Sequence, residues 1–153
     1  RAMKRLALLK TLLEREQTRR DEQMAQVRNA AANVETQRQQ ADGLAAYRTE
    51  YCQKWSAQFR QAAQMEILRS YHGFLARLDQ AIGQQQSVVE HAQRMVEVQR
   101  ARLVEREVRV ATVERLIQRR EAMLARIADR RDQKNLDELA QRPSAARTQA
   151  GLS

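Results

Sequence analysis

Nine apolar residues recur at every seventh position in the second half of the chain, and this register constrains the fold more than any other feature. The series is Leu68, Leu75, Ile82, Val89, Val96, Leu103, Val110, Ile117 and Leu124. An unbroken seven-residue repeat of this length is typical of a coiled-coil helix, because it keeps one apolar stripe facing a partner helix. The sequence therefore predicts a long helix over residues 66–142.

The companion seam positions, three residues after each member of the series, are mixed in character. Some are apolar or small: Tyr71, Leu78, Ala92, Val113 and Ile127. The others are polar: Gln85, Gln99, Arg106 and Arg120. A weaker pattern over residues 3–60 predicts a second, looser helix, with apolar positions at Leu6, Leu9, Leu13, Val27, Ala30, Val34, Ala41, Leu44 and Tyr51. The seam is half-polar, so we expect only moderate stability.

Two long helices in one chain must fold back on each other or pair with other chains. We expect an all-α fold, a long antiparallel two-helix coiled-coil hairpin that forms a single domain over residues 1–142. The heptad phase is lost over residues 56–66, so the turn is placed there, near residue 63. This turn would put Tyr51 beside Leu75, Leu44 beside Ile82 and Val27 beside Gln99. Pro143 should end the second helix at or before Arg142 and leave residues 143–153 as a flexible tail.

The composition also favours long helices over a compact globular domain. The chain has four Gly, one Pro, 4% aromatic and 31% charged residues, which is the usage of coiled coils. It contains neither an apolar run long enough to span a membrane nor a signal-like segment, and Cys52 is its only cysteine. We therefore expect a cytosolic protein without an internal disulfide.

All six aromatic residues lie in one short part of the sequence. Tyr47, Tyr51, Trp55 and Phe59 repeat every four residues, and Tyr71 and Phe74 follow within fifteen residues. In a hairpin they would gather next to the turn, with Trp55, Phe59 and Tyr71 packing there. A two-helix coiled coil buries only a narrow stripe on each helix, so some of these rings should be exposed and available to a partner.

Charge is unevenly distributed along the chain. Residues 1–28 carry eight basic and four acidic groups, residues 100–142 carry twelve and eight, and residues 29–99 carry seven of each. The net charge of +9 would suit nucleic acid, an acidic protein surface or anionic lipid. Nucleic acid is disfavoured because Arg is interleaved with Glu and Asp, and no basic block leads into a parallel zipper. A purely structural parallel dimer of long helices stays an alternative, because a half-polar seam fits either arrangement.

The sequence contains no pattern that predicts catalysis. It lacks a phosphate-binding Gly-rich loop and a nucleophile placed with a base, and His72 and His91 have no acidic or cysteine neighbours at ligand spacing. We therefore expect neither enzymatic activity nor a small-molecule substrate, cofactor or metal.

Three segments resemble the FliJ family of flagellar type III export proteins. The segment "DQKNLDELAQR", residues 132–142, is similar to that family's closing D-Q-K-x-x-D-E-x-A-x-R signature. The segments "QADGLAAYRTEY" and "YHGFLARLDQAI" resemble its Q-x-x-x-L-x-x-Y-x-x-x-Y and F-x-x-x-L-x-x-A-I patterns. The injectisome stalk proteins of the YscO type share the architecture and are the nearest alternative.

The resemblance implies a monomeric stalk without enzymatic activity, peripheral at the inner-membrane export apparatus. Its implied partners are the hexameric export ATPase, which is FliI-like, the export gate protein FlhA, and export chaperones. Carried over by position, the gate-binding residues are Gln40, Leu44, Tyr47, Tyr51, Phe74, Leu78 and Ala81. Gln85 stands where the family pattern has a His. The implied ATPase-binding residues are Leu6, Leu9 and Leu13, lying beside Asp132, Gln133, Lys134, Asp137, Glu138 and Arg142.

Overall fold

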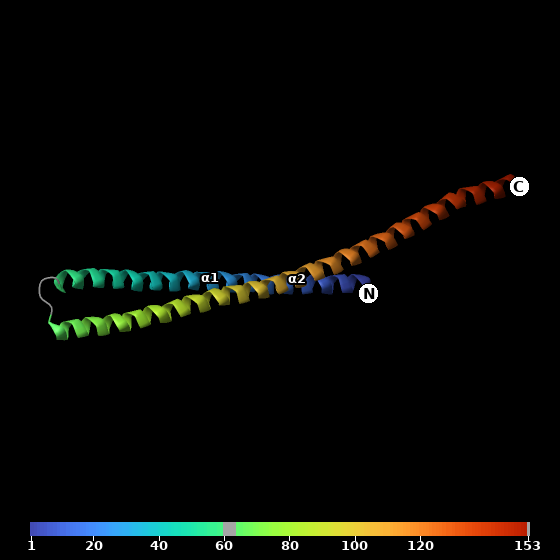
Figure 1. The fold of residues 1–153 in the computed structure, drawn as a ribbon. Coiled ribbons are helices and arrows are strands. Elements are labelled where there is room, and N and C mark those ends of the chain that lie inside the picture. Colours follow the sequence, from blue (N-terminus) through green and yellow to red (C-terminus); the bar gives the residue numbers. More distant parts are fainter. Residues whose placement is uncertain (60–63, 153) are drawn as a thin grey trace. The chain divides into compact units, whose positions relative to one another are not determined.

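The computed structural model describes the backbone of residues 1–59 and 64–152, which form two α-helices (Figure 1). Helix α1 spans Ala2–Phe59 and helix α2 spans Met65–Leu152. The helices pack against each other in antiparallel directions, so the predicted all-α helical hairpin is confirmed. The predicted turn near residue 63 lies outside the described residues.

The predicted end of the second helix at Arg142 is wrong. Helix α2 continues through Pro143 to Leu152, where the sequence had predicted a tail. A proline inside a helix removes one backbone N–H donor and crowds the preceding turn, but a helix can continue across it. Ala145, Ala146, Arg147 and Gln149 follow it, and all four are strong helix formers.

The contacts divide the chain into two units. The first unit contains Arg1–Arg19 and Glu107–Ser153, and the second contains Arg20–Arg106. In each unit a stretch of α1 packs on a stretch of α2, and each is described separately below.

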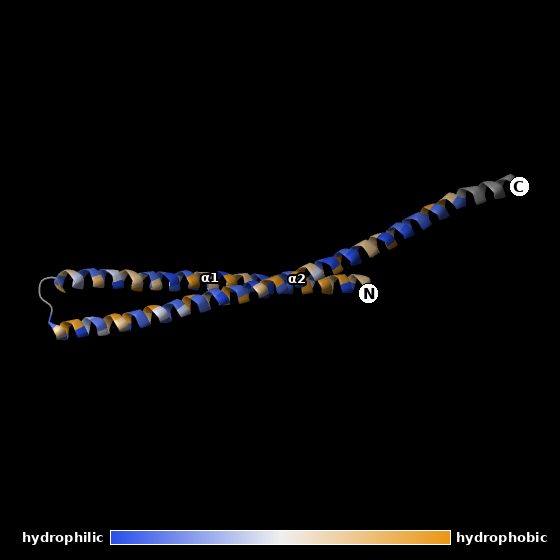
Figure 2. Cartoon of the chain, viewed as in Figure 1, coloured by the Kyte–Doolittle hydropathy of each residue, from blue (hydrophilic) through white to orange (hydrophobic). Residues whose placement is uncertain are grey.

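The core of the second unit follows the predicted heptad register. Leu78, Ala92 and Val96 are buried, and the series positions from Leu68 to Leu103 are all buried or half-buried. Figure 2 shows apolar residues concentrated at the beginning of α2, next to the connection between the helices. The apolar seam therefore packs where the seven-residue spacing placed it.

Two layers of this core consist of paired glutamines. Gln23 donates from Nε2 to the Gln99 backbone oxygen at 3.0 Å and to Gln99 Oε1 at 2.7 Å. Gln85 donates from Nε2 to the Gln37 backbone oxygen and to Gln37 Oε1, both at 2.9 Å. The donor comes from α1 in one layer and from α2 in the other. Gln37 and Gln99 also lie in matching V-E-x-Q-R segments, so the middle of the hairpin repeats one arrangement on both helices.

The observed register of the hairpin differs from the predicted one by about one helical turn. Gln99 pairs with Gln23, whereas the sequence placed Gln99 beside Val27. Tyr51 contacts Tyr71 and Phe74, whereas the sequence placed it beside Leu75. In the same register Leu44 lies opposite Leu78 and not opposite Ile82. A buried amide beside an aliphatic side chain would lose its hydrogen bonds, so the glutamine pairs favour the observed register.

The first unit has a short core and a long exposed segment. Val110, Val113 and Ile117 are buried, and Leu6, Leu9 and Leu13 of α1 are half-buried. Lys10 Nζ lies 3.9 Å from Glu121 Oε1. Every residue from 125 to 142 of α2 is exposed, including Ile127, which the heptads placed in the seam. The segment 125–142 therefore presents all of its side chains to solvent in this structure.

Candidate partner-binding surfaces

The six aromatic side chains form one cluster in the second unit, centred on Tyr51. The ring centroid of Tyr51 lies 4.6 Å from that of Phe74, 5.5 Å from that of Tyr71 and 6.0 Å from that of Trp55. The Tyr51 and Tyr71 rings are stacked. The Phe59 ring lies 5.1 Å from that of Tyr71. The prediction that Trp55, Phe59 and Tyr71 pack together beside the connection is therefore confirmed.

Part of this cluster is open to solvent, as the width of a two-helix seam predicted. Tyr47 is 49% exposed although its ring contacts those of Tyr51 and Phe74. Beside the cluster is a shallow hollow of about 340 Å³, lined by Tyr51, Trp55, Glu66, Ile67, Ser70 and Tyr71. Exposed rings next to a shallow hollow are typical of a protein-binding surface.

Several polar side chains lie beside the aromatic cluster. Arg48 forms a two-pronged ion pair with Asp79, with Nε 2.5 Å from Oδ1 and Nη2 3.4 Å from Oδ2. The hydrogen bond to Asp79 raises the pKa of Arg48. Arg48 also lies 3.9 Å from Cys52 Sγ. The hydrogen-bonding interaction with Cys52, together with desolvation, raises the pKa of Tyr71.

Sequence reasoning missed this ion pair. Arg48 occupies a seam position of α1, where a charge is unexpected, and Asp79 lies 31 residues further along the chain. The only available signal was that interruption of the seam, because the pairing depends on the hairpin register.

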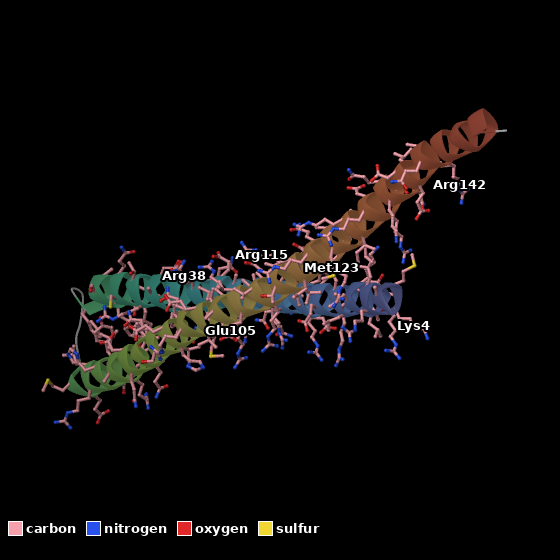
Figure 3. The ribbon with its side chains drawn as sticks, turned by 90° about the vertical axis from the view of Figure 1, so that its right-hand side faces the viewer. Lys4, Arg38, Glu105, Arg115, Met123 and Arg142 are labelled. Carbon is pink, nitrogen blue, oxygen red and sulfur yellow. The ribbon has the colours of Figure 1, made fainter. Side chains whose placement is uncertain are left out.

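The exposed segment 125–142 of α2 is the other candidate surface. The apolar series ends at Leu124, and Arg131 and Glu138 occupy the next two positions of that series. Leu136 and Leu139 are 66% and 57% exposed. Figure 3 shows the Arg142 side chain projecting from this part of α2. The segment presents charges and a few apolar side chains to solvent.

A family model described as Flagellar FliJ protein matches residues 4–149. The chain belongs to the FliJ family. The match confirms the family that the three segments indicated. This family is a non-catalytic component of flagellar export. The chain therefore has a role connected with flagellar protein export. Neither a search of curated proteins nor one of solved structures gives a match.

In this FliJ-family chain the seven implied gate-binding residues all belong to the second unit. Gln40 and Tyr47 are exposed, and Leu44, Tyr51, Phe74 and Ala81 are half-buried. Leu78 is only 7% exposed, so its main role is to hold the two helices together. The other six residues are accessible, wholly or in part, to a partner.

The implied ATPase-binding residues are not brought together in this FliJ-family chain. Leu6, Leu9 and Leu13 are half-buried against α2, close to Lys10 and its ion-pair partner Glu121. Asp132, Gln133, Lys134, Asp137, Glu138 and Arg142 are all exposed. Asp132 lies eleven residues beyond Glu121, roughly 16 Å along the helix. The two groups were expected to lie side by side, but among the described residues the polar side chains lie beyond the stretch of α2 that packs on the leucines of α1.

The described residues offer no membrane-crossing element, since neither helix has an apolar stretch of the required length. Among the same residues, no group of three or more His, Cys, Asp or Glu side chains is arranged to hold a metal ion.

Proposed function

We propose that this FliJ-family chain is a non-enzymatic stalk of the flagellar export apparatus that contacts the export ATPase and the export gate through separate surfaces. The observation that carries the proposal is the chemical difference between the aromatic cluster of the second unit and the charged segment 125–142 of the first. Each surface is exposed beyond what the hairpin needs for its own packing. Each therefore suits a different partner.

The gate-facing surface consists of the accessible residues around the aromatic cluster. Tyr47 is held by its contacts with Tyr51 and Phe74, so little side-chain entropy is lost when a partner covers it. Aromatic side chains fixed in this way commonly dominate binding energy. We assign this surface to FlhA.

The ATPase-facing surface is the exposed segment 125–142, and the half-buried leucines of α1 form a separate part of the same first unit. A single exposed helix with alternating charges can enter a ring and contact several subunits unequally. Such unequal contacts would favour particular nucleotide states, provided that the free energies of those contacts differ. The chain would then promote ring assembly and activity without catalysing any step. Such a stalk would be monomeric and peripheral to the inner membrane, and it would also bind empty export chaperones.

The test is stimulation of the cognate export ATPase, paired with binding to the cytoplasmic domain of the cognate gate protein. Lys134→Ala and Arg142→Ala should reduce ATPase stimulation and leave gate binding intact. Tyr47→Ala and Phe74→Ala should do the reverse. Arg115→Ala, an exposed change elsewhere on α2 (Figure 3), serves as the matched control.

If only the aromatic variants failed to stimulate the ATPase, the assignment of the two surfaces to the ATPase and the gate would be reversed. An injectisome stalk of the YscO type would present similar surfaces, and it is distinguished by which ATPase responds. A nucleic-acid-binding coiled coil would bind duplex DNA at low salt, and its affinity would fall steeply as salt rises. A structural parallel dimer would sediment at twice the chain mass.

A further inference from the structure

The two flanks of the second unit differ sharply in charge. We define the uncharged flank by the positions beside the seam on one side: Gln26, Asn29, Asn33, Thr36, Gln40, Gly43 and Tyr47 of α1, and Phe74, Arg77, Ala81, Gln84, Val88, His91, Met95 and Val98 of α2. Among these positions, Arg77 is the only one with an Asp, Glu, Lys or Arg side chain. The charged flank, on the other side, carries Arg28, Glu35, Arg38, Asp42, Asp79, Glu90 and Glu97 over the same length.

The structure confirms that the charges gather on one side. A hollow of about 440 Å³ is lined by Glu35, Arg38, Glu97 and Arg100, among others, and a second of about 380 Å³ by Arg38, Asp42 and Glu90. Both hollows therefore lie on the charged flank. The contact between Tyr47 and Phe74 joins the two helices on the uncharged flank.

The uncharged flank contains an apolar column that the hairpin does not use. Phe74, Ala81, Val88 and Met95 lie seven residues apart along α2. Val88 and Met95 are 43% and 36% exposed, and Phe74 and Ala81 are half-buried. A two-helix coiled coil needs only two apolar positions per heptad, and this column is a third. A third apolar position at constant spacing is the pattern of a helix that accepts another helix beside its first partner.

The α1 side of the flank offers hydrogen-bonding groups without charge. Gln26, Asn33 and Gln40 are exposed and seven residues apart, and Tyr47 continues their column. Amide side chains both donate and accept, so they suit uncharged polar groups on a partner. In a chain with 31% charged residues, a strip this free of charge avoids the desolvation cost that charged groups would impose on docking.

We propose that the uncharged flank is the docking groove for one amphipathic helix of a partner protein. The contacting face of that helix carries apolar residues at heptad spacing and no full charge. Its footprint extends from Phe74 to Met95, about 31 Å at the helical rise per residue. The groove includes Gln40, Tyr47, Phe74 and Ala81 and continues past them to Val88 and Met95. The inference rests on the proposed function for its partner, the export gate protein.

The exposed apolar area favours a partner helix over a second copy of this chain. The partly exposed residues Tyr47, Phe74, Val88 and Met95 offer roughly 250–300 Å² between them. A stable dimer typically buries about 800 Å² on each partner. The column is thus too small for a permanent self-interface but has the length and spacing for a reversible helix-in-groove contact.

The experiment compares the binding of the full chain and its variants to the cytoplasmic domain of the cognate gate protein. Val88→Glu and Met95→Glu should each weaken binding about tenfold, or about 1.4 kcal/mol, because a charge would be covered by the apolar face of the partner. Gln86→Glu and Gln93→Glu add the same charge to the charged flank of the same helix and should bind like the unmodified chain. Circular dichroism verifies that all four variants remain helical.

A second measurement tests whether the bound partner is a helix. A photoreactive residue placed at position 81, 88 or 95 should cross-link to partner residues about seven apart along one segment. Cross-links scattered over several segments would overturn the proposal, as would sedimentation showing that a second copy occupies the flank. Unchanged binding of V88E and M95E together with loss of binding by Tyr47→Ala would overturn this inference and leave the proposed function standing. Unchanged binding of all three variants would overturn both.

Discussion

The Gln37–Gln85 layer provides a direct test of how a half-polar seam holds this hairpin in register. Gln85 Nε2 donates two hydrogen bonds to Gln37, both at 2.9 Å, and both side chains are half-buried. Each hydrogen bond contributes about 0.5–1.5 kcal/mol net. Partial access of water lowers that contribution, so we assign about 1–2 kcal/mol to the pair.

The perturbation is a double-mutant cycle of Gln37→Ala, Gln85→Ala and the combined variant. Gln85→Ala removes both hydrogen bonds and should destabilise the hairpin by about 1.5 kcal/mol. Gln37→Ala removes only the bond to Oε1, because the backbone oxygen of residue 37 remains, so it should destabilise the hairpin by about 1 kcal/mol. The combined variant should lose less than the sum, with a coupling energy of about 0.5–1.5 kcal/mol, because one hydrogen bond joins the two side chains. Exposed Gln39, whose Nε2 lies 3.4 Å from Glu35 Oε1, is the control, and Gln39→Ala should change stability by less than about 0.5 kcal/mol.

The assay is urea unfolding followed by circular dichroism at 222 nm, with the free energy of unfolding extrapolated to water. A coupling energy below about 0.3 kcal/mol would refute the reasoning, because the two glutamines would then act independently. A second variant pair separates stability from register. Leucine at both positions should raise stability by about 1 kcal/mol through added apolar burial, while removing a layer that disfavours a one-heptad slip.

Three further outcomes are expected. Leu78→Ala should destabilise the second unit by about 2 kcal/mol in thermal unfolding, because Leu78 is 7% exposed in the core; a loss below about 0.5 kcal/mol would show that the seam relaxes around the site. Asp79→Asn should lower the melting temperature at low salt and have less effect at about 1 M NaCl, since the Arg48–Asp79 ion pair is exposed; an effect independent of salt would contradict this. Cys52 and desolvation raise the pKa of Tyr71, so the folded state favours the neutral hydroxyl. The resulting stability is fully present below the ordinary tyrosine pKa of about 10 and is lost as the pH rises through the raised pKa. Ultraviolet titration of tyrosinate should show Cys52→Ala moving the Tyr71 midpoint back towards the ordinary value, and an unmoved midpoint would exclude the thiol as the cause.

The sequence predicted only part of the candidate surfaces. The aromatic cluster followed from spacing, because residues four apart on a helix share a face wherever the helix lies. The Arg48–Asp79 pair and the uncharged flank did not, since each depends on which residues of two distant segments lie beside each other. The heptads alone did not fix that register: the sequence placed Gln99 beside Val27, and the structure pairs it with Gln23, four residues away.

The sequence by itself determined the helical class and the seam of this FliJ-family chain, whereas the antiparallel pairing of the two helices came from the structure. Its seven-residue period from Leu68 to Leu124 requires a partner helix, and that information is local. Only the tertiary structure decided the register, the burial of Leu78 and the separation of Leu6–Leu13 from the segment 125–142. These depend on which residues of the two helices lie beside each other and on which buried amides find partners, because a glutamine in the seam is stable only where another polar group meets it.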